Sequence, residues 1–334
     1  MIVNLPDTTT SKVSKKLMAL REQGGVIALG RVLTLVVVTK SGLEEEAIEA
    51  ANDASREHPC RIIVLADAGK DAEDRLDAQI RVGGDAGASE VIVLRGYGQL
   101  AHESESLVAA LLLPDAPIVA WWPHGAPENA CETSIGAIAH RRITDSANEP
   151  DPQAALERIH RTYKAGDTDL AWTRLTNWRI QLAAALDEVD SSPVTAVAVE
   201  GASDSPSTIL LAAWLTLTLD APVTIVADLA GTGIRRVRLT RPGGDVQLFR
   251  PGLSVAELTQ PGQPAQRISL PPRSLRDCLA EELRRLDPDE VFGEAVSAVA
   301  IPPMQDFLPA RFGASTGGSA HARPHGPARS LIAN

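Results

Sequence analysis

Aromatic side chains are scarce in this chain of 334 residues: they make up 3% of it, whereas hydrophobic residues make up 44%. The core must therefore be built mainly from Ala, Val, Ile and Leu, and each of the five tryptophans stands out. No stretch approaches the ~18 consecutive apolar residues that a membrane helix needs. The start, MIVNLPDTTTSKVSKK, lacks the apolar core of a secretion signal. We expect a globular, cytoplasmic protein with no membrane partner.

Positive charge is also in short supply. The chain has 32 Lys and Arg against 43 Asp and Glu, which gives a formal net charge of −11. Nonspecific binding to nucleic acid needs a basic surface that displaces counterions from the phosphates. The charge balance therefore argues against nucleic acid as a partner.

The three cysteines, Cys60, Cys131 and Cys278, are widely separated and form no CxxC motif. Reduced thiols in a reducing compartment are the default for such a pattern. Cys60 opens an apolar run and Cys278 lies in a predicted helix, so we expect both to be buried and inert. Cys131, in a loop with Pro and Gly, is the candidate for an exposed thiol, although no resolving partner is evident.

Motifs of catalysis and cofactor binding are missing as well. The turn after the first buried strand, residues 39–42, lacks the glycine spacing of both dinucleotide-binding and phosphate-binding loops. Glycines at 83–87 and 96–98 flank strands and are interpreted as turns. Histidines fall at no metal-ligand spacing, and no G-x-S-x-G elbow occurs. We expect no catalytic residue, no metal and no cofactor, hence a protein that is not an enzyme.

The first half of the chain alternates strand and helix signals. Residues 32–38 and 60–67 are apolar and rich in β-branched side chains, and the helix signal between them predicts a β-α-β unit with a right-handed crossover. Further strands are predicted at 75–82, with half-exposed alternation that suggests an edge, at 89–97 and at 116–122, with a helix over 99–113. We expect an α/β domain with a mixed sheet over residues 1–165.

The second half predicts another mixed-sheet α/β domain, over residues 166–300. Strand and helix signals at 193–229 form a β-α-β unit, and three short strands joined by Pro and Gly turns follow between 235 and 270. Two closing helices over 274–299 are split at Asp287 and Pro288. Residues 301–334 are rich in Pro, Gly, Ala and Arg and are predicted to be a disordered tail. The predicted fold class is α/β, with two mixed-sheet domains.

Residues 167–179 concentrate two tryptophans and two arginines. Asp167, Thr168 and Asp169 are suited to cap a helix, which should begin here. At helical spacing, one apolar stripe contains Ala171, Leu175, Trp178, Leu182 and Ala185, with Trp172 at its border; Arg174 flanks Trp178 and Arg179 flanks Trp172. Either this is a core helix whose arginines pair with acids, or it is a docking or anion site.

Two shorter segments carry the same ambiguity. Trp121 and Trp122 are adjacent on a strand and must point to opposite faces, so either both are packed or one is an exposed anchor. In the segment RRITD, Arg141 and Arg142 either pair with Asp145 and other acids or grip a sugar phosphate. Periodicity alone leaves both alternatives open.

These segments carry a family resemblance. The stretch GDTDLAWTRLTNWR at 166–179, together with RVLTLVVV at 31–38, RVGGDAGASEVIVLR at 81–95, LPDAPIVAWWP at 113–123 and CLAEELRRLDPDEVF at 278–292, resembles the glucose-6-phosphate dehydrogenase assembly protein family, OpcA, in its actinobacterial form. The resemblance implies a non-catalytic partner that promotes the active oligomer of glucose-6-phosphate dehydrogenase or activates it allosterically. It would thereby set flux into the oxidative pentose phosphate pathway.

We expect the tryptophan-rich and arginine-rich segments to line one face at the junction of the two domains. The candidate partner-binding residues are Trp121, Trp122, Arg141, Arg142, Asp145, Asp167, Asp169, Trp172, Arg174, Trp178 and Arg179. A rival hypothesis is a sensor or enzyme with a sugar-phosphate or nucleotide pocket at the carboxyl ends of its parallel strands. A third is a redox sensor that acts through Cys131.

Overall fold

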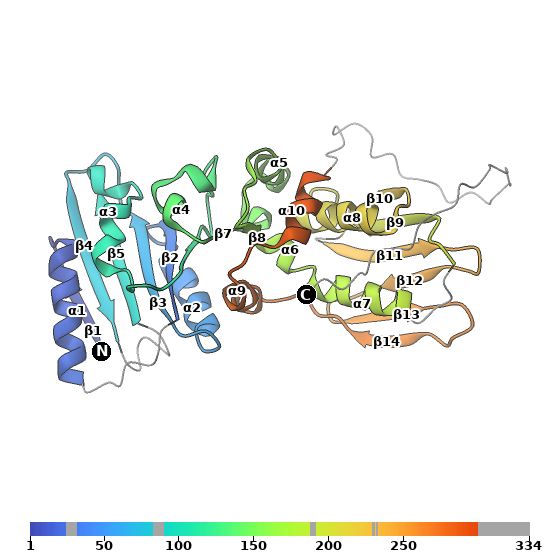
Figure 1. Ribbon diagram of the computed structural model, residues 1–334, viewed down its shortest axis with the longest axis horizontal. Coiled ribbons are helices and arrows are strands. Elements are labelled where there is room, and N and C mark those ends of the chain that lie inside the picture. Colours follow the sequence, from blue (N-terminus) through green and yellow to red (C-terminus); the bar gives the residue numbers. More distant parts are fainter. Residues whose placement is uncertain (25–31, 83–89, 188–191, 229–230, 232, 300–334) are drawn as a thin grey trace. The chain divides into compact units, whose positions relative to one another are not determined.

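The computed structural model describes residues 1–24, 32–82, 90–187, 192–228, 231 and 233–299 (Figure 1). The predicted tail and the turn at 83–87 lie outside these ranges. The chain divides into two compact units: Met1–Thr173 with Arg273–Glu290 form the first, and Arg174–Pro272 with the residues from Val291 onward form the second. The sequence predicts a continuous second domain from 166 to 300, whereas here Arg273–Glu290 belongs to the first unit. Both units are α/β with mixed sheets, which confirms the predicted fold class.

The first unit contains an eight-stranded sheet in the order β1-β4-β5-β3-β2-β6-β7-β8. Six neighbouring strands are parallel: β5 (Glu90–Tyr97), β3 (Cys60–Asp67), β2 (Leu33–Lys40), β6 (Ile118–Trp121), β7 (Arg141–Thr144) and β8 (Asp167–Asp169). The parallel part of the sheet starts at β2, extends outward through β3 to β5, and then returns to β6 on the other side of β2. This is the order of a doubly wound sheet, whose topological switch point lies between β2 and β6.

Two antiparallel strands complete this sheet at the β5 end. The predicted strand at 75–82 is β4 (Arg75–Arg81), and its residues alternate between buried and half-buried as expected. It is not an edge strand, because β1 (Ile2–Leu5) pairs with its far side. Strand β1 was not predicted, because its four residues are too few to show a period.

Helices cover both faces of the first sheet. On one face, α2 (Glu44–Ala54) and α9 (Leu275–Arg284) pack over alternate residues of the parallel strands, in a core that includes Cys60, Trp121 and Cys278. On the other face lie α1 (Thr10–Gly24), α3 (Glu105–Val108) and α4 (Ser134–Ile138), in a core that includes Trp122. Because both faces are covered, both adjacent indoles are buried.

The helix predicted over 99–113 is wrong. The segment forms short pieces, η2 (Gly98–Ala101), α3 and η3 (Ala109–Leu111). The Ser104 side chain accepts a hydrogen bond of 3.3 Å from the Ser106 amide, so a new helix begins there instead of the first one continuing. The remaining helices of the first unit are η4 (Ala130–Glu132), η5 (Ser146–Asn148), α5 (Pro152–Thr162) and α6 (Leu170–Thr173).

The helix predicted from residue 167 starts later and is divided. Asp167–Asp169 is β8, which pairs with β7 as a parallel strand, so its backbone groups bond within the sheet. Two helices follow, α6 and α7 (Thr176–Asp187), and the division between the units falls between Thr173 and Arg174. The predicted apolar stripe is confirmed as buried in Ala171, Leu175, Trp178, Leu182 and Ala185.

The second unit contains a six-stranded sheet in the order β10-β9-β11-β12-β13-β14. The parallel pair β9 (Ala196–Gly201) and β10 (Val223–Ala227) is joined by α8 (Pro206–Leu219). An antiparallel meander continues through β11 (Ile234–Thr240), β12 (Val246–Phe249), β13 (Val255–Thr259) and β14 (Gln266–Ser269). Strand β13 was not predicted. Helix α10 (Glu290–Ser297) belongs to this unit except for its first residue.

Candidate functional site

Arg141, the first arginine of RRITD, is held inside the first unit by helix α9. Its Nε donates to Glu282 Oε2 at 3.0 Å, and its Nη1 donates to the Asp287 carbonyl at 2.8 Å. The other carboxylate oxygen of Glu282 accepts from the hydroxyls of Thr168 and Thr173. Arg141 and Glu282 are 4% and 5% exposed, so they form a buried and fully bonded ion pair. The pairing alternative holds for Arg141, with an acid 141 residues away.

Arg142 pairs with Asp167 of the neighbouring strand. The guanidinium also donates to the carbonyls of Ala139 at 3.1 Å and Ala165 at 2.7 Å. Burial raises the pKa of the Asp167 carboxyl, and the hydrogen bonds from Arg142 and the Lys164 amide act in the opposite direction. All three of these contacts are with groups of the first unit. Arg142 therefore joins β7 to β8.

Asp169 completes this polar interior. Its carboxylate accepts hydrogen bonds from the Thr144 hydroxyl at 2.7 Å, from the amide and hydroxyl of Ser146 at 2.8 and 2.7 Å, and from the Ala171 amide at 2.9 Å. The last of these caps α6, which is the role that the sequence predicts. The neighbouring Asp145 is also buried.

The four tryptophans among the candidate residues are buried. Trp122 donates from Nε1 to Glu103 Oε2 at 3.0 Å, and Trp172 donates from Nε1 to Asp289 Oδ2 at 2.8 Å. In the second unit, the Arg250 guanidinium lies 5.2 Å from the ring centroid of Trp178. Of the eleven candidate partner-binding residues, only Arg174 and Arg179 are not buried, and both are intermediate in exposure.

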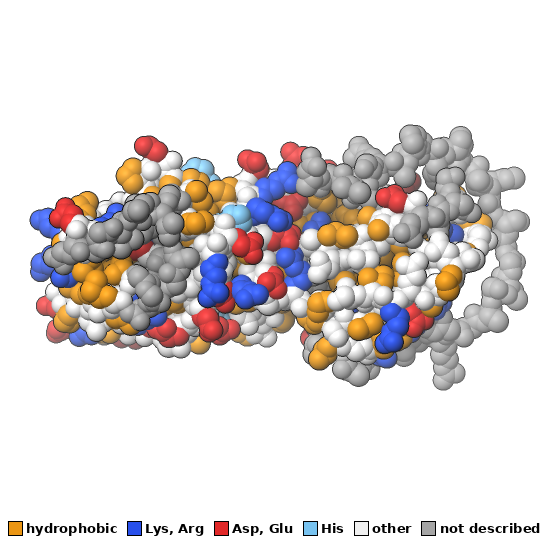
Figure 2. All heavy atoms as spheres, turned by 90° about the horizontal axis from the view of Figure 1, so that it is seen from below, with side chains coloured by type: hydrophobic (Ala, Val, Ile, Leu, Met, Phe, Trp, Pro, Cys, Tyr) orange, Lys and Arg blue, Asp and Glu red, His pale blue; other side chains and the backbone are white. Residues whose placement is uncertain are grey.

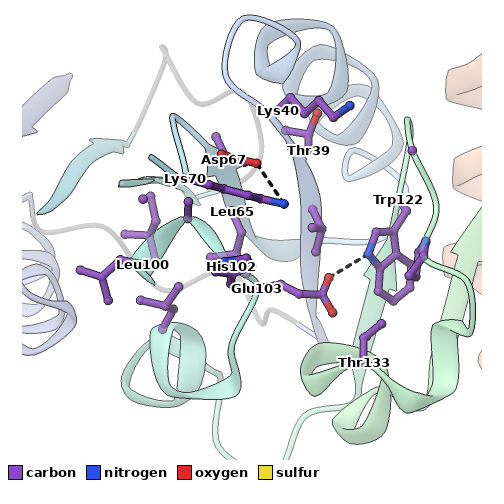
Figure 3. Close-up of a pocket in the computed structure, with 18 of the residues that line it drawn as sticks. Thr39, Lys40, Leu65, Asp67, Lys70, Leu100, His102, Glu103, Trp122 and Thr133 are labelled. Carbon is purple, nitrogen blue, oxygen red and sulfur yellow. Dashed lines mark hydrogen bonds and ion pairs between the residues drawn. The ribbon is translucent and has the colours of Figure 1, made fainter. Parts of the chain in front are cut away.

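A cavity of about 420 Å³ opens in the first unit, at the carboxyl ends of β2, β3 and β5 and beside the loop that follows β6 (Figure 3). Its apolar lining includes Leu65, Leu94 and Trp122. Its polar lining includes Lys40, Asp67, Lys70, His102, Glu103 and His124. Open α/β sheets bind ligands at this edge, next to the switch point. The rival hypothesis from the sequence expects a pocket at this place.

Several lining residues were not recognised from the sequence. Asp67 ends β3 and Lys70 follows three residues later, with their charged atoms 3.6 Å apart. Glu103 lies in the segment wrongly predicted as a continuous helix. The positions of Lys40 and Asp67 could have indicated the cavity from the sequence. Both lie at or just beyond the ends of predicted parallel strands, and the polar side chains at such strand ends lie at one edge of the sheet.

The usual phosphate position of a doubly wound sheet is occupied by the protein itself. That position is the start of the helix after the first parallel strand, here α2 after β2. The Glu44 carboxylate accepts hydrogen bonds from the Gly42 amide and from Arg95 Nε, the latter at 2.8 Å. Burial opposes the charge on Glu44, but hydrogen bonds from its own amide, from Arg95 and from the Gly42 amide together lower its pKa below the ordinary value.

Cysteine burial agrees with the sequence analysis. Cys60 and Cys278 are fully buried, while Cys131 is half-exposed and its thiol donates to Asn129 Oδ1 at 3.3 Å. Within the described residues, no group of three or more His, Cys, Asp and Glu side chains is placed to hold a metal ion. None of the described helices has the length and apolarity needed to cross a bilayer. On the face shown in Figure 2, basic and acidic side chains are interspersed.

Comparison with known proteins gives two family matches, both to domains of a glucose-6-phosphate dehydrogenase subunit. The model for the N-terminal domain of that family matches residues 51–161. The model for its C-terminal domain matches residues 165–296. A search of curated protein sequences returns no match.

Solved structures of similar arrangement are distant in sequence. An oxidoreductase from Sinorhizobium meliloti is 8% identical, with a TM-score of 0.44, over 80% of this chain and 94% of that one. A putative oxidoreductase from Magnetospirillum magnetotacticum MS-1 is 12% identical, with a TM-score of 0.41, over 80% of this chain and 99% of that one. At such low TM-scores the likeness carries no information on activity.

Proposed function

Because the chain belongs to the family of glucose-6-phosphate dehydrogenase subunits, as its sequence motifs predict, we propose that it is a non-catalytic assembly factor and allosteric activator of that dehydrogenase. The observation that carries the proposal is a family match that extends over most of both units. The protein would act in the cytoplasm, without nucleic acid or a membrane as a partner, and would raise flux into the oxidative pentose phosphate pathway.

Such a role requires no new chemistry. A protein that binds only the active oligomer of the dehydrogenase stabilises that oligomer by mass action. If it binds the competent conformer more tightly than the others, it shifts the population toward that conformer and lowers half-saturation or raises turnover. The internal bonding of Asp167, Asp169 and Glu282 supports a structural use of these carboxylates.

The candidate partner-binding residues divide into two groups by exposure. The nine buried residues would act on the partner by fixing the shape of the surface above them. Arg174 and Arg179 are half-exposed, and Ile180, next to Arg179 on α7, is 55% exposed. Arginine is over-represented among the residues that contribute most of the binding energy at protein interfaces. We therefore propose that the partner contact of the second unit lies on this part of α7.

The first experiment measures initial rates of the cognate dehydrogenase across glucose 6-phosphate concentrations, with and without this protein, while light scattering follows the mass of the mixture. We expect a higher rate or a lower half-saturation together with a larger complex. If neither rate nor mass changes, the assembly role is wrong.

The second experiment replaces Arg179 and Ile180 by alanine. We expect activation to fall several-fold while the thermal unfolding of the protein changes little, since Ile180 is exposed and Arg179 is only partly buried. Arg267→Ala, an exposed arginine on β14 of the same unit, is the matched control. Full activation by the Arg179/Ile180 variant would contradict a partner contact on α7.

A further inference from the structure

The cavity of the first unit is a binding site in its own right, separate from the proposed partner contact. We propose that it binds a small hydroxylated monophosphate of the sugar-phosphate class, and not a dinucleotide. The site is formed by residues of the first unit alone. Its occupancy can therefore be measured without the dehydrogenase, and the inference does not depend on the assembly role.

Buried polar atoms without partners point to a ligand with hydroxyl groups. Among the described residues, Glu103 Oε1, His124 Nδ1 and Thr39 Oγ1 are buried and have no hydrogen-bond partner. All three residues line the cavity, and Thr39 is 5% exposed. Buried polar atoms in proteins are nearly always bonded, so three exceptions around one cavity need an explanation. Hydroxyl groups can donate to the carboxylate and both donate and accept at the other two positions.

Glu103 is positioned to receive such a hydroxyl. Its other oxygen is held by the Trp122 indole at 3.0 Å, which fixes the carboxylate at the cavity wall (Figure 3). The Trp122 ring and the nearby leucines offer an apolar surface to the carbon skeleton of a sugar. An acceptor anchored beside an aromatic side chain therefore suits a polyol better than a wholly charged ligand.

Two lysines supply the charge for a phosphate. Lys40 ends β2 and Lys70 follows β3, and both are exposed at the cavity. Lys40 reaches across the switch point, since a Cβ atom placed on Gly125 of the loop after β6 would lie 4.0 Å from Lys40 Cε. Lys70 Nζ is 3.6 Å from Asp67, an ion pair that is longer than an ordinary hydrogen bond. Their two ammonium groups would attract a phosphate at this cavity as point charges.

A dinucleotide does not fit the same edge. The amide of Gly42, which a pyrophosphate would need, already donates to Glu44. The first turn of α2 carries Glu44, Glu45 and Glu46, whose charges repel a phosphate at that helix start. A volume of about 420 Å³ is near the lower end of the roughly 300–1,000 Å³ range of ligand pockets. The bound molecule is therefore of monosaccharide size.

The test is calorimetric titration of the full chain, alone, with glucose 6-phosphate, 6-phosphogluconate, glucose, inorganic phosphate and NADP. We expect at least one sugar phosphate to bind more tightly than either glucose or inorganic phosphate. In the variant Lys40→Gln/Lys70→Gln, that binding should weaken by about tenfold or more, because each lost charge-assisted contact weakens affinity. Lys15→Gln, an exposed lysine of α1, is the matched control and should bind as the unchanged protein does.

Glu103→Gln provides an independent readout, since an amide oxygen can keep the bond from Trp122 while the acceptor charge is lost. We expect weaker sugar-phosphate binding with unchanged affinity for inorganic phosphate. The inference is overturned if no sugar phosphate binds, if NADP binds as tightly, or if the double lysine variant binds unchanged. A thermal melt of each variant shows that it is folded, so lost binding is attributable to the site.

Discussion

Arg141 and Glu282 form the buried ion pair around which the polar interior of the first unit is arranged. Both charges are removed from water, and their remaining hydrogen-bonding groups contact Thr168, Thr173 and the Asp287 carbonyl. Such a pair adds little net stability compared with apolar residues, but loss of one partner leaves an uncompensated buried charge. The ion pair instead fixes the position of α9 relative to β7.

Replacing Glu282 by alanine should therefore destabilise the protein strongly. We expect the free energy of unfolding to fall by about 3–5 kcal/mol, because Arg141 would remain charged without its acceptor. Urea denaturation followed by tryptophan fluorescence measures the change. Glu281→Ala is the control: its partner Arg273 is near the surface, so we expect a loss of about 1 kcal/mol at most. Equal losses in the two variants would contradict the importance of burial.

Glu44 provides a pH-dependent test at the same scale. Its pKa is lowered in the folded state, so its contribution to stability is present above the pKa of the unfolded chain and is lost as pH falls through the folded pKa. We expect Glu44→Gln to lose about 1.5 kcal/mol near neutral pH and to match the unchanged protein in acid. Denaturation curves at several pH values measure this difference. Glu46→Gln, exposed in the same helical turn, is the matched control and should leave the free energy of unfolding near neutral pH unchanged.

Helix α7 has a buried face and an exposed face. Its inner face buries Trp178 under Arg250, and its outer face presents Ile180 to solvent. Burial also lowers the pKa of Arg250, since the surrounding protein disfavours its charge. The core alternative holds for the inner face of α7, and the proposed partner contact lies on its outer face.

Trp178→Ala should consequently act through folding. Truncation of a buried indole leaves a cavity, and we expect the free energy of unfolding to fall by about 3–5 kcal/mol. Thermal unfolding measures the loss. Activation of the dehydrogenase, measured well below the melting temperature, should be retained by the fraction that is folded. A stably folded Trp178→Ala variant that fails to activate would instead assign the indole a direct part in partner binding.

At the scale of the whole molecule, the first unit is completed by a helix from near the end of the chain. Helix α9 buries Cys278, Leu279 and Leu283 against the first sheet. The last strand of that sheet along the chain, β8, ends at Asp169, more than a hundred residues earlier. Without α9, this sheet face and the Arg141 side chain would be open to water. The two units are therefore interleaved along the chain.

Ending the chain at Pro272 should disrupt the first unit although residues 1–173 remain. We expect binding of an apolar dye and loss of the near-ultraviolet circular dichroism of Trp121 and Trp172, because the core on the α9 side would be exposed. A chain ending at Val299 keeps every described element and should retain both properties of the intact protein. Unchanged spectra in the shorter chain would show that α9 is dispensable.

Local patterns in the sequence determined most of the elements. The β-branched runs predicted β2, β3 and β5, and helical spacing predicted the buried stripe through Trp178, because each signal depends on neighbours within a few residues. The pattern failed where elements are short, as in β1, or where a cap restarts a helix, as at Ser104. The family motifs likewise lie within continuous segments.

Tertiary structure decided what the individual side chains contact. Asp167 has the local features of a helix cap, but pairing with β7 makes it part of a strand and the partner of Arg142. Glu282 meets Arg141 across 141 residues, and Lys40, Glu103 and His124 meet at one cavity because the strand order brings their loops to the same edge. The sequence by itself determined local conformation and family, since both depend on residues close in the chain. Ion pairs, the cavity and the exposed face of α7 required the tertiary structure, because they depend on which distant segments pack together.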